Sequence, residues 1–296
     1  MPKYLIVNAD DFGMSPGVSR GILEAHAAGV VTSTTALVNT AWAEESLCWA
    51  VARAPRLGLG LHINLSFGQP VLAPTMVPSL VGRDGRFFSG NRLLQAMKHF
   101  RKFDIRREVG AQFERFVALA GRTPDHLDSH QFLGGLHLDV FAAMLELAGA
   151  ERIPLRGLGD FLDRARLEQL LLRIRRENGG GPALANFLTL PDTLNNLRRR
   201  LPPFRAADAL RYEFYGSGVR RKVVLDLFDS LPEGVTELMW HPGYANGIED
   251  SYRLPRETEL AILRDPLLRA AARDRGVELV SFAVLGRHET DHENLR

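Results

Sequence analysis

Short apolar segments alternate with stretches of helical periodicity along most of this 296-residue chain. Runs of apolar and β-branched residues between turn residues are typical of buried strands. They cover residues 4–9, 34–39, 57–65, 126–130, 153–156, 236–241 and 277–284. Strands that alternate with helices favour a parallel sheet, and about seven such units favour a barrel. We therefore predict an α/β fold, namely an irregular, TIM-like (β/α) barrel of about seven strands.

The helical segments between these runs carry their own boundary signals. The first predicted helix, 16–28, follows the capping residue Ser15, begins with Pro16 and stops at Gly29, which is the order expected at the two ends of a helix. The other helical patterns cover 44–54, 105–120, 138–148, 219–230 and 257–275. One helix is thus expected after most of the strands.

Two stretches interrupt the alternation. Residues 68–103 are rich in proline and glycine and read as a long loop, and residues 157–215 hold helical patterns around the sequence ENGGGP. Long excursions from a compact domain usually have a function or lack order. We expect a single domain over residues 1–296, with substrate specificity residing in these two excursions.

Composition excludes several classes of protein. The chain is 45% hydrophobic and 24% charged, with a formal net charge of +2, which is ordinary for a soluble globular protein and gives no reason to expect a nucleic-acid partner. The single cysteine excludes an intrachain disulfide framework and a cysteine-rich zinc site. The N-terminal apolar run is too short for a signal peptide or a membrane span. We expect a cytoplasmic protein.

The first predicted strand ends on two adjacent carboxylates, Asp10 and Asp11, in the sequence NADDFG. Adjacent aspartates repel each other and are disfavoured inside a strand. A helix start would explain one acid beside its N-terminus, but not two. The pair therefore indicates a functional site.

Histidines fall at the same end of other predicted strands. His62 follows LGLGL, His126 and His130 flank LDS, and His241 follows ELMW. In a barrel these strand ends converge on the face where such folds carry their active sites. Each histidine taken alone could be a core or turn residue, but their coincidence with the Asp10 and Asp11 end of the first strand favours one shared pocket.

Imidazole and carboxylate groups are ligands of hydrolytic divalent metals, which keep positions open for water and substrate. One aspartate and two histidines would suffice, and the neighbouring aspartate could take the proton of the attacking water. Asp128 and Ser129 could fix the imidazole tautomers. Zinc fits such a ligand set best, and magnesium is the alternative.

Five motifs together resemble the YdjC-like carbohydrate deacetylase family, whose members include chitooligosaccharide deacetylases. They are NADDFG, GLHINL, HLDSHQ, TELMWHPGY and the C-terminal SYRLPRETELAILRDP with GVELVSF. The resemblance runs from Tyr4 to about Phe282 and is weakest over 157–215. It implies an irregular (β/α) barrel, often a homodimer, that hydrolyses the N-acetyl group of an amino sugar and releases acetate.

The resemblance also implies roles for individual residues. It makes Asp11, His62 and His130 the ligands of one divalent metal ion, with His126 as the alternative to His130. The catalytic roles it implies are general base for Asp10, general acid for His241 and an orienting role towards the base for Arg156.

One motif departs from the family pattern. Members commonly follow DSH with further histidines, whereas this chain reads DSHQFLGGLH, with Phe132 and Gly134 at those places. The substrate is therefore expected to be an amino sugar or N-acetylated carbohydrate, either an oligosaccharide or a glycoconjugate, and a substrate other than a chitooligosaccharide is one of the open alternatives. Other metal-dependent hydrolases, such as amidohydrolases or phosphoesterases, and a non-catalytic sugar-binding barrel remain as alternatives.

Aromatic residues that could stack on a sugar ring occur in both excursions and at one strand end. We expect residues 214–218, Phe87, Phe88 and Trp240 to approach the pocket, because apolar ring faces suit sugars. Trp240 lies inside a predicted strand and could equally belong to the core.

Overall fold

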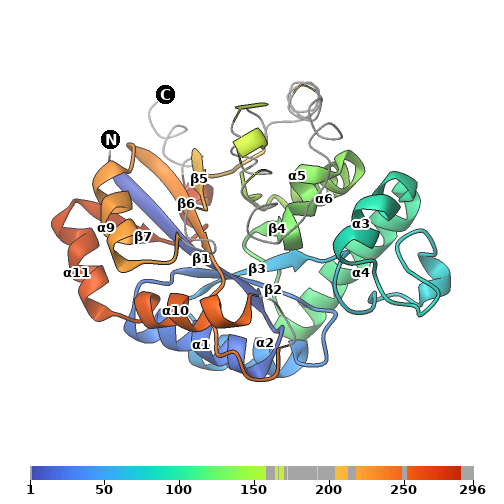
Figure 1. Ribbon diagram of the computed structural model, residues 1–296, viewed down its shortest axis with the longest axis horizontal. Helices are drawn as coiled ribbons and strands as arrows, with labels where there is room; N and C mark the ends of the chain where they lie inside the picture. The colour runs from blue at the N-terminus through green and yellow to red at the C-terminus, as the bar shows by residue number, and fades with distance from the viewer. Residues whose placement is uncertain are drawn as a thin grey trace.

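The computed structural model describes residues 2–157, 204–212, 218–248 and 252–287, together with residues 164, 165, 167–169, 172 and 192. In these residues a curved parallel sheet lies at the centre and helices pack around it (Figure 1). The strands are β1 (Lys3–Phe12), β2 (Ser33–Ala36), β3 (Gly58–Ile63), β4 (Leu127–Ser129), β5 (Ala209–Arg211), β6 (Gly234–Trp240) and β7 (Val277–Val280). The predicted irregular (β/α) barrel is confirmed.

All strand pairs are parallel, in the order β4-β3-β2-β1-β6-β5, and β7 pairs with β1 outside this order. Strand β1 holds the sheet together because it has three partners. Its first half lies between β6 and β7, and its second half lies between β6 and β2. The C-terminal end of β1 is therefore surrounded by neighbouring strands, and whatever side chains it carries there are buried.

The edges of the sheet differ from the sequence prediction. The predicted strand 153–156 makes only one bridge, between Leu155 and Leu127 of β4, and the Leu155 N–H donates to the carbonyl of Arg205 at 2.9 Å. Pro154 shortens this pairing because it has no N–H to donate. The strand that completes the sheet is β5, which lies inside the predicted excursion 157–215. A three-residue strand is too short to give a readable alternation of apolar and polar residues.

The helices are α1 (Pro16–Ala28), α2 (Ala43–Arg53), α3 (Gly90–Ala96), α4 (Lys102–Ala120), α5 (Leu133–Leu136), α6 (Leu138–Glu151), α9 (Arg221–Ser230), α10 (Arg253–Leu263), α11 (Pro266–Asp274) and α12 (Val284–Arg287), with 3-10 turns at Pro74–Met76, Met97–His99 and His130–Phe132. Helices α1, α2 and α10 lie along one side of the sheet and α9 and α11 at its β7 end (Figure 1).

Helix α1 begins and ends as predicted. The hydroxyl of Ser15 accepts the Val18 N–H at 3.1 Å and Pro16 occupies the first turn. At its other end Gly29 lies so close to α10 that a Cβ would overlap the carbonyl of Leu263. Only glycine allows this contact, which packs α1 against α10.

The predicted helix 257–275 is two helices. Asp265 accepts the Leu267 N–H at 2.9 Å as the N-cap of α11, and Pro266 occupies its first position. Proline cannot continue the hydrogen bonds of the preceding helix, so α10 has to end before it. Helix α10 therefore ends at Leu263, and its first turn lies next to the strand ends.

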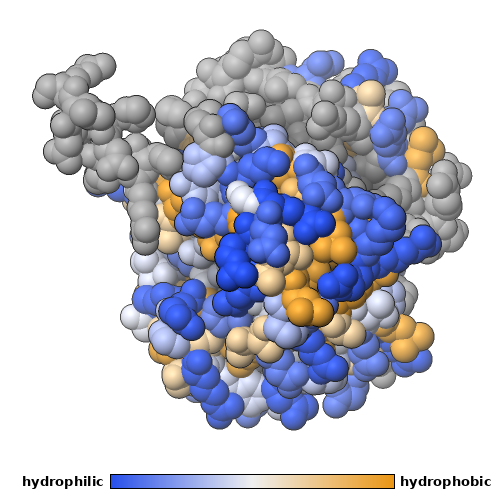
Figure 2. All heavy atoms as spheres, turned by 90° about the vertical axis from the view of Figure 1, so that its left-hand side faces the viewer, coloured by the Kyte–Doolittle hydropathy of each residue, from blue (hydrophilic) through white to orange (hydrophobic). Residues whose placement is uncertain are grey.

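The surface at the α9 and α11 end is mixed. Figure 2 shows this side, where hydrophilic residues cover much of the described surface with apolar residues between them. Helix α11 turns Leu268 and Ala272 into the core. Among the described residues no single helix has the length and apolar character to cross a membrane, and only the pair His130–Leu136 and Leu138–Glu151, bent by 96°, meets that test when taken together.

Candidate active site

Asp10 and Asp11 occupy the C-terminal end of β1, where the strand carries a bulge. The register to β2 shifts between Ala9 and Phe12, and Asp11 has φ +71°. In a regular strand adjacent side chains point to opposite faces. Aspartate tolerates the left-handed conformation better than most residues, and the bulge turns both carboxylates into one buried cluster. This is how the two acids come to share one site.

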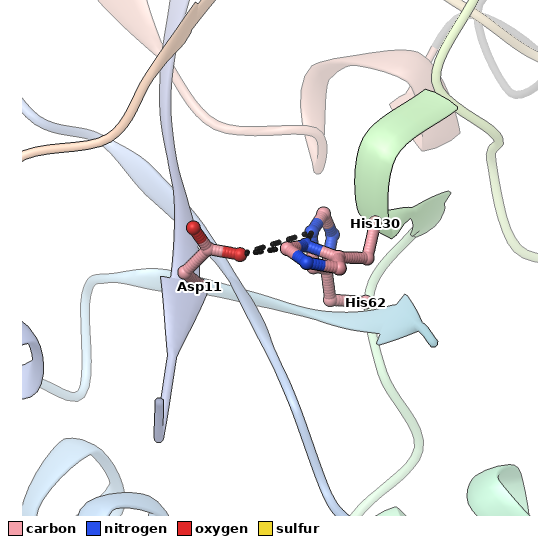
Figure 3. Close-up of side chains that lie close together, drawn as sticks. All are labelled: Asp11, His62 and His130. Carbon is pink, nitrogen blue, oxygen red and sulfur yellow. Dashed lines mark hydrogen bonds and ion pairs between the residues drawn. The ribbon is translucent and has the colours of Figure 1, made fainter. Parts of the chain in front are cut away.

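Asp11, His62 and His130 converge from the end of β1, the end of β3 and the 3-10 turn His130–Phe132 that follows β4 (Figure 3). The Oδ1 atom of Asp11 lies 3.4 Å from Nε2 of His62 and 3.0 Å from Nδ1 of His130. The two ring nitrogens are 3.3 Å apart. Asp11 and His62 are buried, and the side chain of His130 is 12% exposed. The cluster is therefore buried at the C-terminal ends of the strands, and His130 is its most exposed member.

The chain turns sharply after His130. Gln131 and Phe132 have φ +54° and +55°, a strained conformation for residues other than glycine. The Ser129 hydroxyl accepts the Gly134 N–H at 2.8 Å and so closes the turn. Ser129 thus stabilises the loop backbone, whereas Asp128 is the residue that contacts an imidazole.

The donor atoms of this cluster fit a divalent cation. Asp128 Oδ1 lies 2.5 Å from Nδ1 of His62, which places the ring proton there and leaves a lone pair on Nε2. Two imidazole nitrogens and one carboxylate oxygen then face a common point, which is the ligand set of a hydrolytic metal. Without a cation a proton can replace it, because Asp128 and Asp11 outweigh the effect of burial and raise the pKa of His62 to about 10.

Arg156 binds the second aspartate. Its Nη1 and Nη2 atoms lie 2.7 and 2.6 Å from the two oxygens of Asp10, and its Nη1 is 2.9 Å from Asp128 Oδ2. Its Nε donates to Glu237 Oε1 at 2.6 Å. Burial alone would lower the pKa of Arg156, but these carboxylates raise it well above its ordinary value. One buried cation is thus shared by three carboxylates.

Arg256, which comes from α10, binds Asp11. Its Nη2 lies 2.7 Å from Asp11 Oδ2, and its Nη1 donates to the main-chain carbonyl of His241 at 3.4 Å. Burial alone would raise the pKa of Asp11, but Arg256 and His130 hold it well below its ordinary value. Asp11 is therefore an anion with one oxygen on Arg256 and the other turned towards the histidines.

His241 follows β6 and is partly buried. Its main-chain N–H donates to Glu259 Oε2 at 2.5 Å, and the hydroxyl of Tyr252 donates to Glu259 Oε1 at 2.5 Å. Burial lowers the pKa of His241 to about 4, although Asp11 and Asp10 oppose it. Burial likewise raises the pKa of Glu259 to about 8. At neutral pH the imidazole of His241 is thus uncharged.

His126 lies outside the cluster. Its ring stacks on Phe282 with centroids 3.6 Å apart, and its Nδ1 is 2.5 Å from Asp125 Oδ1. A Cβ on Gly60 would overlap this ring, so the glycine makes room for it. Within the described residues, the groups able to hold a metal ion are Asp11, His62 and His130, and Asp10, His62 and Asp128.

The aromatic prediction is wrong where it can be checked. Trp240 has no exposed surface and Phe87 is 6% exposed, so both belong to the core. Phe88 packs against that core, and residues 214–217 lie outside the described residues. The aromatic residue beside the cluster is Phe67, which is 40% exposed and whose ring centroid lies 6.2 Å from that of His130.

Sequence reasoning missed three charged residues of the site, namely Glu237, Arg256 and Glu259. Glu237 is a carboxylate inside an apolar strand segment, which is itself a signal because unpaired charges are rarely buried. Arg256 and Glu259 are three residues apart and so share one face of α10. That face is buried, which sequence periodicity alone did not indicate.

Comparisons with known proteins agree with this geometry. A model of the YdjC-like protein family matches residues 4–274. A carbohydrate deacetylase of Geobacillus stearothermophilus is 37% identical over 95% of this chain and 98% of its own length. A chitooligosaccharide deacetylase of Proteus mirabilis is 33% identical over 95% and 98% of the two chains.

A solved structure shows the same fold. It is a crystal structure from Enterococcus faecalis V583, described as a candidate cellobiose-phosphate cleavage protein, with 30% identity and a TM-score of 0.76 over 96% of this chain and 99% of that one. The family model and the relatives each cover nearly the whole chain and include all the residues of the cluster. The chain therefore belongs to the YdjC-like protein family.

Proposed function

We propose that the chain is a metal-dependent carbohydrate deacetylase that removes the acetyl group from the nitrogen of an amino sugar. The observation that carries this proposal is the convergence of Asp11, His62 and His130 beside an aspartate, Asp10, that is bound by its own arginine. The names of the relatives support the same activity, since they include carbohydrate and chitooligosaccharide deacetylases.

Asp11, His62 and His130 would hold one divalent ion, and zinc suits two imidazoles and a carboxylate best, with magnesium as the alternative. When bound, such an ion lowers the pKa of a water molecule and polarises an acetyl carbonyl. Asp128 serves this set by fixing the tautomer of His62, so that Nε2 rather than Nδ1 faces the ion.

Asp10 is the proposed general base. Its Oδ1 accepts hydrogen bonds from Arg156 at 2.6 Å and from Asn8 at 2.8 Å, whereas its Oδ2 accepts only from Arg156, at 2.7 Å, in the described part of the chain. A carboxylate oxygen has two acceptor positions. Oδ2 therefore keeps one lone pair that can take the proton of the attacking water, while Arg156 fixes the direction of the carboxylate.

His241 is the proposed general acid. It starts neutral because burial lowers its pKa to about 4. The negative charge that develops on the acetyl oxygen in the transition state favours a protonated imidazole. His241 would take up a proton from solvent as this charge develops and pass it to the departing sugar nitrogen, while the proton that Asp10 removed from the water returns to solvent, so that acetate and a free amine leave.

The proposed sugar class rests on the aromatic residues near the exposed side of His130. Phe67 offers an exposed ring next to His130, and its main chain is held by Asn64, which accepts the Phe67 N–H at 2.9 Å and donates to its carbonyl at 2.8 Å. A fixed aromatic face of this kind suits a pyranose ring. With Phe132 where many members have histidine, we propose an N-acetylated sugar other than a simple chitooligosaccharide.

We further propose that the protein is a cytoplasmic homodimer. The resemblance to the family supports the dimer. Light scattering of the purified protein measures the assembly, and fractionation of cells that express it measures the location.

Acetate release from a panel of N-acetylated mono-, di- and oligosaccharides tests the activity. We expect release by the metal-loaded protein, loss after chelation and recovery when zinc is restored. His130→Ala should abolish release and lower metal content, whereas the control His126→Ala should retain metal. Release that survives complete chelation would contradict the proposal.

A further inference from the structure

Two side chains from the first two turns of α10 hold the main chain of His241. Strand β6 stops pairing at Trp240, so the polar main-chain groups of the next residue need other partners. Its N–H donates to Glu259 Oε2 at 2.5 Å, and its carbonyl accepts from Arg256 at 3.4 Å. Both polar groups of one peptide position are thus fixed by residues three apart on the same helix face.

The same arginine also contacts Asp11. Arg256 is 2% exposed, and its Nη2 lies 2.7 Å from Asp11 Oδ2 and 3.6 Å from the sulfur of Met14. One planar guanidinium therefore spans from the end of β1 to the end of β6. A lysine ammonium could pair with Asp11, but as a single point it lacks the two separate nitrogens this contact uses.

We propose that Arg256 and Glu259 are positioning residues that set Asp11 and His241 at a fixed distance from each other. This inference rests on the proposed function, in which Asp11 binds the metal ion and His241 donates a proton. Arg256 occupies Oδ2 of Asp11 and leaves Oδ1 facing His62 and His130, where it would serve as the ligand atom. Glu259 accepts a hydrogen bond from the hydroxyl of Tyr252 and fixes the position of the His241 main chain, from which the imidazole extends.

The two residues should fail in different ways. Loss of the arginine fork frees Asp11 Oδ2 and should weaken metal binding, since residues behind metal ligands typically contribute 10- to 100-fold to affinity. Glu259→Gln puts an amide nitrogen in place of one carboxyl oxygen, so one of the two hydrogen bonds to the His241 N–H and the Tyr252 hydroxyl is lost. Asp11 is untouched, so metal affinity should stay the same while His241 is held less firmly. That defect should lower kcat more than it changes KM.

The test is calorimetric titration of the metal-free protein with Zn²⁺, together with kcat and KM for acetate release from the best sugar of the panel. The variants are Arg256→Lys and Glu259→Gln. The matched control is Arg269→Lys, because Arg269 also donates to a main-chain carbonyl, that of Gly29 at 2.9 Å, on the α11 side of the fold. Thermal melting of all four proteins separates folding defects from binding defects.

We expect Arg256→Lys to raise the Kd for Zn²⁺ by about 10-fold or more, with excess Zn²⁺ restoring part of its kcat. Glu259→Gln should keep the Kd within about two-fold of the parent and lower kcat. Arg269→Lys should change neither. If Arg256→Lys melts too early for titration, the Glu259→Gln split between Kd and kcat still decides the second half of the proposal.

Two results would overturn the inference. One is a folded Arg256→Lys variant whose Kd for Zn²⁺ is unchanged. The other is a Glu259→Gln variant in which the affinity for Zn²⁺ and kcat fall by the same factor. A parent protein that binds no divalent ion would instead contradict the proposed function itself, so the two failures can be told apart.

Discussion

Asp10 and Asp11 are neighbours on one strand, each is buried, and each is bound by an arginine, yet the two arginines bind them differently. Arg156 takes both oxygens of Asp10 and is itself shared with Asp128 and Glu237. Arg256 takes one oxygen of Asp11. The arginine thus fixes the orientation of the whole Asp10 carboxylate, which suits its proposed role as a base, whereas Asp11 keeps one oxygen on the histidine side, which suits its proposed role as a ligand.

The sharpest way to break this comparison is Asp10→Asn. Asparagine keeps the shape and can still accept from Arg156, but it cannot accept a proton from water. We expect metal content to remain and kcat to fall by roughly 10²–10⁴, the contribution typical of a general base. Metal analysis and acetate release on the same preparation check it, and loss of metal together with rate would show that Asp10 is a ligand as well.

Replacing the arginine beside Asp10 should lower the stability of the protein more than replacing the arginine beside Asp11. Arg156→Met leaves three buried carboxylates without their cation and should lower the free energy of unfolding by about 3–5 kcal/mol. Arg256→Met should cost less in the zinc-loaded protein, because the ion still faces Asp11. Urea unfolding of both variants with Zn²⁺ present measures the difference, and equal losses would contradict the contrast between the two arginines.

Asp11→Asn should act on metal binding. Because residues behind ligands already contribute up to about 100-fold, loss of a ligand charge should weaken Zn²⁺ binding by more than about 100-fold. Added Zn²⁺ should restore part of the activity, unlike in Asp10→Asn. Zn²⁺ titrations with activity measured in parallel make the comparison, and identical behaviour of the two variants would mean that their roles are not divided.

A further prediction concerns pH. Burial raises the pKa of Glu259 from 4.5 to about 8, and this carboxyl accepts hydrogen bonds from Tyr252 and His241. A raised folded-state pKa gives stability that is complete below the unfolded value and is lost as pH rises through the folded value. The unfolding free energy should therefore fall between about pH 5 and about pH 8, by at most about 1.4 kcal/mol per pH unit.

Glu259→Gln should flatten that fall, since glutamine does not titrate. Urea unfolding of the parent and the variant at both ends of this range gives the two slopes. Equal slopes would contradict a raised pKa of Glu259 in this range.

Much of the fold could be predicted because it depends on local signals. The bounds of α1 follow from a cap, a proline and a glycine, and the strands β1, β3 and β6 are apolar runs long enough to recognise. Strand β5 and the break at Pro266 show where this fails. A three-residue strand has no readable period, and an apolar pattern that continues across a break looks like one helix.

The candidate site was predicted in part. The sequence placed polar residues at strand ends, and the resemblance pointed to Asp11, His62 and His130, which the structure brings together. His126 and His130 could not be told apart from spacing, because both lie near the end of the same short strand. The structure separates them: His126 stacks on Phe282, and His130 begins the turn after β4 and lies in the cluster.

By itself the sequence determined the longer strands, their parallel arrangement, and the gathering of carboxylates and imidazoles at one end of them, since these properties depend on periodicity and on residues near one another in the chain. Only the tertiary structure decided how the charges pair. Arg156 meets Asp10 across 146 positions and Arg256 meets Asp11 across 245, and no local pattern encodes contacts of that range. The different surroundings of two adjacent aspartates arise from the bulge in β1 and from the packing of α10, both of which exist only in the folded chain.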